Sequence, residues 1–282
     1  MDQKDIRFGY VMRMLEKALG DNQGDTILPL PVHLKIDTGM HRLGFDPSDV
    51  ENLTERLARK PGLHVQSVFS HLAASEDPAE DEFTLQQIGL LKNAAAKIQA
   101  GLGYPVLAHI LNSAGISRFP DAQMGMVRLG IGLYGVGFNE AEQNNLRNVS
   151  TLKTIISQIR KVKAGDTIGY NRKGVAKRDM LIAILPIGYA DGFSRRLGNG
   201  AGKVMINGKP APTIGNISMD TCMVDVTDLA GSGDFPAIQE GDEVIIFGDV
   251  YPISRFARNL GTIPYEVLTS ISRRVKRVYF LE

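Results

Sequence analysis

Three charged side chains follow an apolar strand pattern near the start of the chain, in the order Lys35, Asp37 and Arg42. Apolar and polar residues alternate over 32–37, which predicts a strand with one packed face and one polar face. A glycine-containing turn over 38–44 then presents the arginine. Since β/α barrels carry their chemistry on the turns after parallel strands, this stretch predicts a ligand-binding βα loop.

Helical and strand patterns alternate over residues 1–146, which predicts an α/β fold with βα units and a parallel sheet. Strands are expected over 32–37, 64–70, 106–112 and 126–129, and helices over 8–19 and 50–57. A longer helix is expected after Pro78, with Gly101 as its C-terminal stop. Its predicted buried stripe consists of Leu85, Ile88, Leu91, Ala95 and Ile98.

Residues 147–282 show short, closely spaced strand patterns, which predict a separate and mostly antiparallel β domain. The pair Asn207-Gly208 is a strong signal for a two-residue hairpin turn between strands over 203–206 and 209–212. Further strands are expected over 181–185, 223–226 and 243–247. Short helices are expected over 255–260 and 265–274.

The composition excludes several classes of protein. The 282 residues are 43% hydrophobic, and 32 basic residues oppose 31 acidic ones, so the net charge of +1 provides no field for nucleic acid or an anionic membrane. No segment has the roughly 18 apolar residues of a membrane span. The single cysteine, Cys222, fits a reducing compartment and is expected to be buried, so we expect a cytoplasmic protein.

The string LKIDTGMHRLGF resembles a signature of the alanine racemases, which use pyridoxal 5'-phosphate (PLP). Seven later motifs resemble family motifs in the same order: Ser70-His71-Leu-Ala, His109-Ile-Leu-Asn112-Ser113-Ala, Met126-Val-Arg128-Leu-Gly130-Ile131-Gly-Leu-Tyr134-Gly, Asp166-Thr-Ile-Gly169-Tyr170, Ile187-Gly-Tyr189-Ala-Asp191-Gly, Asn216-Ile-Ser-Met219-Asp220 and Pro264-Tyr265-Glu266. The resemblance implies the C-terminal half of a TIM-type β/α barrel over 1–146, which binds PLP, followed by the family's β domain over 147–282. It also implies interconversion of L-alanine and D-alanine for cell-wall precursors.

The resemblance also implies which residues bind the cofactor. Arg128 matches the family arginine that faces the pyridine nitrogen, and His71 matches the histidine that packs beside the ring and hydrogen-bonds the catalytic tyrosine. The other implied cofactor-binding residues, which contact the phosphate, are Ser113, Gly130, Ile131 and Tyr265. Outside these motifs the same residues would be interpreted as ordinary ion-pair, turn or packing residues.

Catalysis and substrate binding are implied for five further positions. Tyr170 matches the tyrosine that serves as a base and enters the active site from the other subunit, which implies a homodimer. Met219 and Tyr189 match residues that reach in from the partner, and Arg42 lies near the substrate carboxylate. Lys35 matches a lysine that is carbamylated in many members and orients the arginine.

The family opens with a strand that carries the Schiff-base lysine, and no segment of this chain resembles it. We therefore expect an N-terminally truncated racemase without activity of its own. Its segments MHRLGF and EDEFTLQQI resemble those of racemases that are fused behind a cell-wall amino-acid ligase. Two alternatives stay open: a racemase of another small amino acid, and a catalytically inactive PLP-binding or dimerisation module. The expected partners are a small-molecule substrate and a second copy of the chain, without nucleic acid, membrane or metal.

Overall fold

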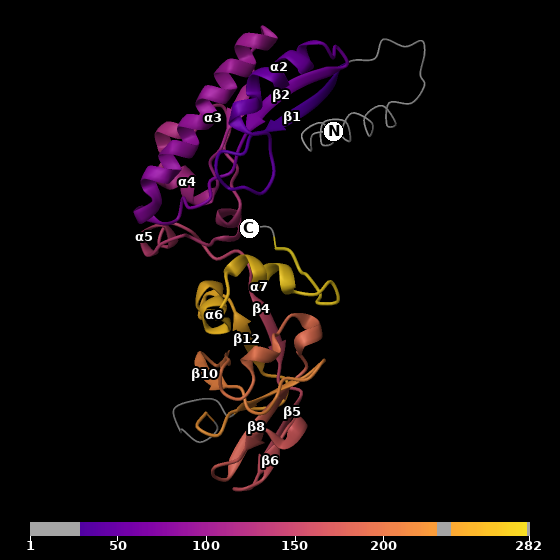
Figure 1. Cartoon of the computed structure of the whole chain (residues 1–282). Helices are drawn as coiled ribbons and strands as arrows, with labels where there is room; N and C mark the ends of the chain where they lie inside the picture. The colour runs from indigo at the N-terminus through magenta and orange to yellow at the C-terminus, as the bar shows by residue number, and fades with distance from the viewer. Residues whose placement is uncertain (1–28, 230–237, 281–282) are drawn as a thin grey trace, which may run out of the picture. The chain divides into compact units, whose positions relative to one another are not determined.

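The computed structural model describes residues 29–229 and 238–280 and consists of two compact units, Met1–Arg128 and Leu129–Glu282 (Figure 1). The helix predicted over 8–19 lies outside the described residues. The domain boundary at residue 146 stays a prediction.

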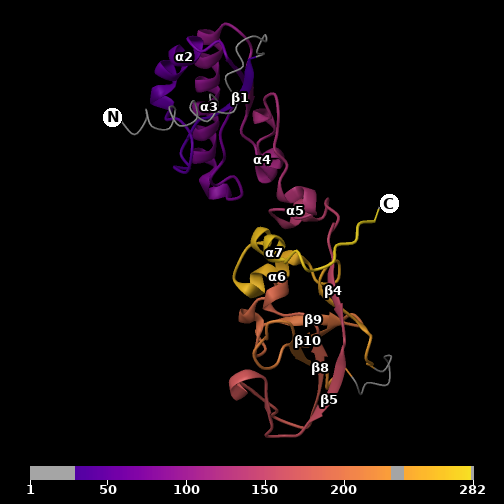
Figure 2. The ribbon, with the colours of Figure 1, turned by 90° about the vertical axis from the view of Figure 1, so that its right-hand side faces the viewer.

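Over residues 29–128, the first unit is built on a parallel three-stranded sheet in the order β1-β2-β3. Its strands are β1 (Leu30–Lys35), β2 (Leu63–Phe69) and β3 (Leu107–His109). Helix α2 (Val50–Ala58) connects the first two strands, and α3 (Asp81–Leu102) connects the last two. Both helices cover the same face of the sheet (Figure 2), so the unit consists of consecutive βα units, as the sequence predicts. Its shorter helices are η1 (Pro47–Asp49), η2 (Pro78–Glu80), α4 (Ser113–Arg118) and η3 (Pro120–Ala122).

The long helix differs from its prediction in two respects. Ile88, Leu91 and Ile98 are buried as expected, but Leu85 is 57% exposed because it lies just outside the face that contacts the sheet and α2. The helix also continues past Gly101 and ends at Gly103, whose φ of 76° gives the left-handed conformation that glycine adopts without strain.

The strand predicted over 126–129 is wrong. Its apolar residues Met126, Val127 and Leu129 are exposed, and the segment makes only single backbone contacts beside β3, such as the N–H of Arg128 donating to Leu111 O at 3.0 Å. The strand predicted over 106–112 is shorter than expected, because β3 ends at His109 and the chain enters α4 at Ser113 after Asn112 caps that helix. A full ladder therefore cannot form along this edge.

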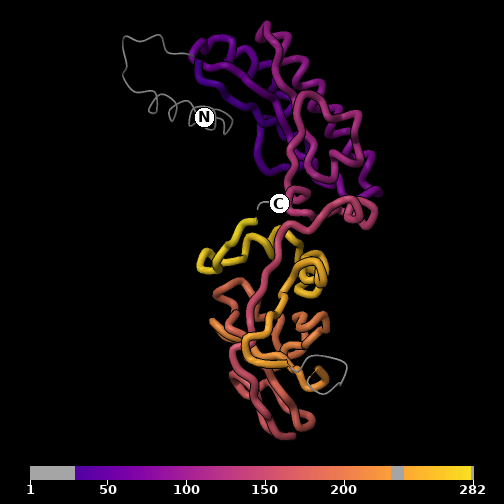
Figure 3. The backbone as a smooth tube through the Cα atoms, turned by 180° about the vertical axis from the view of Figure 1, so that it is seen from behind, coloured from indigo at the N-terminus to yellow at the C-terminus, as the bar shows by residue number. Residues whose placement is uncertain are grey.

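The second unit contains three antiparallel sheets, in the orders β10-β9-β12-β4, β11-β8-β5 and β6-β7. The strands are β4 (Leu152–Ile155), β5 (Gln158–Val162), β6 (Thr167–Ile168), β7 (Gly174–Val175), β8 (Met180–Leu185), β9 (Lys203–Ile206), β10 (Lys209–Pro212), β11 (Cys222–Asp225) and β12 (Glu243–Phe247). The helices are η4 (Ile131–Tyr134), α5 (Glu140–Gln143), η5 (Tyr170–Arg172), η6 (Tyr189–Asp191), η7 (Arg195–Leu197), α6 (Ile253–Leu260) and α7 (Pro264–Ser270). Helices α6 and α7 lie at one end of this unit, and β5 and β6 lie at the other (Figure 3).

Local turn chemistry explains the hairpin that joins β9 to β10. Asn207 and Gly208 have φ angles of 49° and 75°, the positive pair that a type I′ turn requires, so the hairpin prediction is confirmed. The helix predicted over 265–274 is too long. Ile271 leaves the helix with a ψ of 114°, and the residues after it form an irregular segment.

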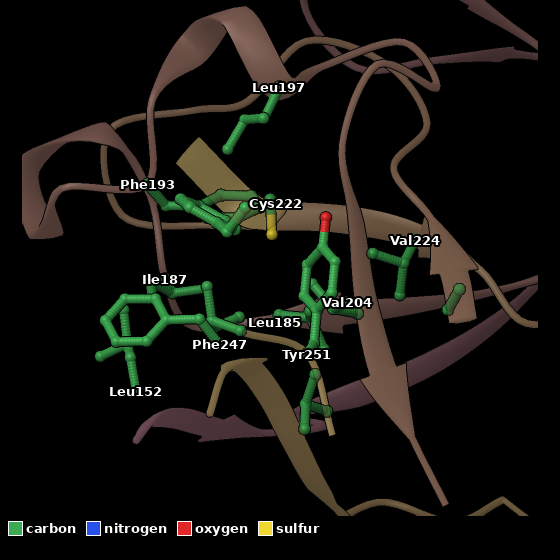
Figure 4. Packing of buried hydrophobic residues seen from close by; sticks show 14 of the residues in the cluster. Leu152, Leu185, Ile187, Phe193, Leu197, Val204, Cys222, Val224, Phe247 and Tyr251 are labelled. Carbon is green, nitrogen blue, oxygen red and sulfur yellow. The ribbon is translucent and has the colours of Figure 1, made fainter. Parts of the chain in front are cut away.

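The core of the second unit is formed by side chains from its sheets and from α6 (Figure 4). Phe256 contacts the rings of Phe193, Phe247 and Tyr251, with ring centroids 5.8–6.2 Å apart. Cys222 is fully buried there, and burial raises the pKa of its thiol to about 12, which confirms the predicted structural thiol. Across residues 29–229 and 238–280, no helix has the length and apolar character that crossing a membrane requires.

Candidate cofactor and substrate site

The turn after β1 is held by the carboxylate of Asp37. Its Oδ1 accepts the backbone N–H of Gly39 at 3.1 Å and of His41 at 3.0 Å. Burial alone would raise the pKa of Asp37, but these N–H donors hold it below its usual value. Gly44 has a φ of 131°, and a Cβ there would lie 2.6 Å from the Asp37 nitrogen. The turn is therefore fixed by its own sequence, and it leaves Arg42 exposed.

The guanidinium of Arg128 is fixed by backbone carbonyls near the carboxyl ends of β2 and β3. Its Nη2 donates to Ser70 O at 2.5 Å and to Ile110 O at 3.2 Å, and its Cζ lies 5.4 Å from the ring centroid of Phe69. Burial lowers the pKa of Arg128, yet an arginine in a protein stays protonated. The result is a positive charge in a fixed position at the end of the sheet.

His109 is the second nitrogen group beside this charge. Nη1 of Arg128 donates to His109 Nδ1, so the ring hydrogen lies on Nε2, which contacts Ser67 Oγ at 3.1 Å. The serine oxygen lies 2.6 Å from His33 Nδ1. Burial, and then the charge of Arg128, lower the pKa of His109 to about 4. The ring is therefore neutral at physiological pH, and its tautomer follows from its partners.

His71 completes a group of basic side chains in the first unit. Its Nδ1 lies 3.5 Å from Arg128 Nη2, and its pKa is lowered by burial and then by the charges of Arg128, Arg42 and Lys35. The pKa of Lys35 is lowered by burial and by Arg42, although Asp37 acts in the opposite direction. The structure thus brings four of the predicted site residues into one electrostatic group.

Gln87 of α3 links the turns that carry these residues. Its side chain is fully buried; Oε1 accepts from Ala73 N at 2.9 Å, and Nε2 donates to Thr38 Oγ1 at 3.2 Å and to His71 O at 3.1 Å. Thr38 and Ser70 share a further hydroxyl contact of 2.8 Å. One helix residue therefore fixes the turns after β1 and β2 to each other.

The residues that are expected to contact the phosphate lie at the starts of three short helices. Ser113 is the first residue of α4, after Asn112 caps the helix by accepting Gly115 N–H at 3.0 Å. Gly130 directly precedes Ile131, the first residue of η4. Tyr265 is the second residue of α7 and is 43% exposed. Ser113 and Ile131 are buried, whereas Tyr265 is partly exposed.

Tyr170 is presented on an unusual backbone in the second unit. Gly169 has a φ of 77° and Asn171 a φ of 55°, and Asn216 Nδ2 donates to the Tyr170 carbonyl at 3.1 Å. The side chain is 69% exposed. A fixed backbone with a projecting phenol suits a residue that acts outside its own unit.

Tyr189 and Met219 lie on two turns whose backbones are bonded to each other. Tyr189 N donates to Ser218 O at 3.1 Å, and Ala190 N donates to Met219 O at 3.0 Å. A Cβ at Gly188 would lie only 2.3 Å from Met219 O, so the close approach requires glycine. A cavity of about 420 Å³ opens beside Tyr189, and Met219 does not line it. Residues that line it include Tyr189, Arg195, Arg196, Thr262, Glu266 and Ser270.

The sequence patterns predict no functional role for His109, although the structure places it against Arg128. His109 shares a family motif with Ser113 and is the last residue of β3. Its contact with Arg128 joins residues 19 positions apart and is invisible to local patterns. A histidine at the carboxyl end of a predicted barrel strand was the available signal.

The low pKa of His109 predicts a specific pH dependence of stability. Between pH 6.5 and about 4 the unfolded chain binds a proton at this ring that the folded unit does not bind, so the free energy of unfolding falls as the pH falls. Denaturant unfolding at several pH values in this window measures the effect. His109→Gln retains an acceptor and a donor without titrating, so it should reduce the slope; an unchanged slope would contradict the assignment.

Comparison with known proteins covers both units. The family model for the alanine racemase N-terminal domain matches residues 12–137, and the model for the alanine racemase C-terminal domain matches residues 149–279. Alanine racemase 1 of Clostridium acetobutylicum is 37% identical over 99% of this chain and 71% of its own length. Alanine racemase of Rickettsia bellii is 40% identical over 89% of this chain and 58% of its own.

Solved structures agree with these matches. The alanine racemase of Clostridium difficile 630 superposes with a TM-score of 0.82 at 36% identity, over 95% of this chain and 67% of that one. The Bartonella henselae alanine racemase with covalently bound pyridoxal phosphate gives 0.78 at 33% identity, over 89% and 66%. The chain spans 58% to 71% of the length of the first curated relatives. Sequence, domain order and fold all agree, and the chain belongs to the alanine racemase family, with the fold of the C-terminal half of a β/α barrel followed by a β domain.

Proposed function

We propose that this chain supplies cofactor-binding and proton-transferring residues for the PLP-dependent interconversion of L-alanine and D-alanine. The observation that carries the proposal is the Arg128 guanidinium, fixed on buried carbonyls beside a neutral His109 at the carboxyl edge of a parallel sheet. Relatives that are named alanine racemase, and one whose structure contains covalently bound pyridoxal phosphate, support it. The free, buried Cys222 is consistent with a cytoplasmic location, which we also propose.

The residues present fit PLP by the chemistry of their donors. A pyridine nitrogen accepts hydrogen bonds, and Arg128 is a permanently protonated donor. A phosphate accepts backbone N–H groups and hydroxyls, which Gly130, Ile131, Ser113 and Tyr265 would provide. When bound, PLP withdraws electrons from the substrate α-carbon and so acidifies its proton.

Arg128 determines how strong that withdrawal is. Because its proton cannot be transferred, the ring nitrogen stays unprotonated and the electron sink is moderate. The neutral His109 ring holds the guanidinium in one orientation without adding a competing charge. The backbone carbonyls of Ser70, His109 and Ile110 also accept from it. A moderate sink limits side reactions of the deprotonated α-carbon.

Tyr170 is proposed as a base on one face of the α-carbon, acting in the active site of a second copy of the chain. Its 69% exposed side chain on a fixed backbone supports action outside its own unit. A phenol with a pKa near 10 needs coupling to a basic group, and His71 beside Arg128 provides one. A homodimer with shared active sites is therefore part of the proposal.

Substrate binding is assigned to residues on both units. Arg42 on the Asp37 turn and the backbone of Met219 would bind the carboxylate, and Tyr189 would limit the space for the side chain. Burial and the charge of Arg42 lower the pKa of Lys35, and we assign to this lysine the carbamylation that the family resemblance implies, with the carbamate orienting Arg42. Together, the side chains of Tyr170, Tyr189 and Tyr265 would leave little room beyond a methyl group, which favours alanine over larger amino acids.

A stereochemical assay tests this proposal. Protein that carries this chain in its native, full-length context should convert L-alanine to D-alanine only with PLP, and pyridoxal without phosphate should not replace it. Serine should turn over more slowly. Failure to interconvert the enantiomers despite PLP binding would overturn the proposal. Racemisation by the 282-residue chain alone would instead contradict only the expectation that its Schiff-base lysine is missing.

A further inference from the structure

Arg274, in the irregular segment after α7, lies between two carboxylates from distant parts of the second unit. Its Nε donates to Asp191 Oδ1 at 2.6 Å, and its Nη2 donates to Asp220 Oδ1 at 2.7 Å. These hydrogen bonds raise the pKa of Arg274 above its usual value. One guanidinium thus spans residues that are 83 and 54 positions away along the chain.

Both carboxylate oxygens of Asp191 and its backbone carbonyl accept hydrogen bonds. Its Oδ2 accepts the N–H of Gly188 at 2.9 Å, while its backbone carbonyl accepts the N–H of Ser272 at 3.1 Å. The side chain is only 15% exposed. Burial alone would raise the pKa of Asp191, but the hydrogen bonds from Arg274 and Gly188 lower it, so the carboxylate stays charged.

Each aspartate is next to a substrate-binding position of the proposed function. Asp191 ends the turn that carries Tyr189, and Asp220 directly follows Met219. The two turns are tied at the backbone, yet the side chains of Tyr189 and Met219 are 45% and 54% exposed. Because the backbones of the two turns are bonded to each other, the directions in which the side chains of Tyr189 and Met219 project are constrained.

We propose that Arg274 is a positioning residue that sets the separation between Tyr189 and Met219 by holding Asp191 and Asp220 on one guanidinium. This inference rests on the proposed function, in which these two residues contact the substrate. A planar arginine can donate from Nε and Nη2 in two fixed directions, whereas a lysine ammonium is a single point charge and cannot span both carboxylates.

Amide hydrogen exchange on the chain itself tests the mechanical part. Arg274→Met should speed exchange at Gly188, Tyr189 and Ala190 by about threefold or more, because Asp191 loses the guanidinium that connects it to Asp220. The matched control is Arg273→Met, which removes the adjacent exposed arginine that takes no part in these two ion pairs. Equal exchange in both variants would overturn the proposal.

Steady-state kinetics in racemase-competent protein test the functional part. Arg274→Met should raise KM for alanine about tenfold with a smaller change in kcat, and Arg274→Lys should lie between it and the wild type. If Arg274 served only stability, fewer molecules would be active, so kcat would fall at constant KM. Asp220→Asn keeps the shape of the site and provides a second variant if Arg274→Met folds poorly.

The outcomes separate this inference from the proposed function. Faster exchange at residues 188–190 without a change in KM would overturn the role of Arg274 in substrate positioning and leave racemisation intact. Absence of racemase activity in the wild-type protein would overturn the proposed function, while the exchange comparison would still test whether Arg274 holds the two turns.

Discussion

Replacing Tyr170 with phenylalanine should lower kcat for both directions of alanine racemisation by roughly 10²-fold to 10⁴-fold, the range typical of losing a general acid or base. The ring remains, and the Asn216 contact to the backbone carbonyl does not depend on the hydroxyl. Since the side chain is largely exposed, the variant should fold normally. Racemisation in either direction needs a base on each face of the α-carbon, so the loss should be symmetric.

Solvent exchange of the α-proton provides the sharper measurement. In deuterium oxide, Tyr170→Phe should still exchange the proton of one enantiomer, namely the one whose α-proton faces the remaining base. Tyr279→Phe is a matched control, because this tyrosine is 85% exposed and belongs to no predicted site. Equal exchange of both enantiomers, or unchanged turnover, would show that Tyr170 is not a base.

Replacing Arg128 with glutamine should have a comparably large effect, because one side chain serves both the fold and the proposed cofactor site. The carbonyls of Ser70 and Ile110 would lose a charged donor, which costs about 1–3 kcal/mol of stability when a buried group is left unsatisfied. Removing the fixed donor opposite the ring nitrogen should lower kcat by roughly 10²-fold to 10³-fold. Denaturant unfolding and steady-state kinetics measure the two losses separately.

Titration of His109, which lies beside Arg128, tests the same substitution without an activity assay. Loss of the Arg128 charge and of its hydrogen bond to Nδ1 should raise the pKa of His109, which NMR titration of the ring detects. Arg128→Lys keeps the positive charge but not the planar guanidinium with its several N–H donors. It should therefore restore part of the pKa shift of His109 and little of the lost free energy of unfolding. An unchanged His109 titration in Arg128→Gln would contradict the proposed interaction between the two side chains.

Features whose causes are local were predictable from the sequence. The Asp37 turn depends on hydrogen bonds spanning two and four residues, and the Asn207-Gly208 hairpin depends on two backbone angles. The alternation of strand and helix patterns was sufficient for the βα units of the first unit. Family motifs added the candidate site, since their residue types state which chemistry each position can perform.

Features whose causes are distant in sequence were not predictable. Leu85 belongs to the apolar stripe of α3 in the sequence, but its exposure depends on which face of the helix contacts the sheet and α2. The low pKa of His109 requires the folded position of Arg128, and the two carboxylates on Arg274 come from turns more than fifty residues away. Patterns along a chain show which face is apolar, but they do not show which tertiary contacts form.

The buried amide of Gln87 makes α3 a mechanical link between the core of the first unit and the proposed cofactor and substrate site. The same helix carries Ile88 and Leu91 in the core and, through Gln87, holds the turn containing Thr38 to the loop containing His71. A core substitution that shifts this helix by a fraction of an ångström would move both turns together. Variants selected in this core for heat resistance would therefore also change substrate affinity, and adaptation of one property would constrain the other.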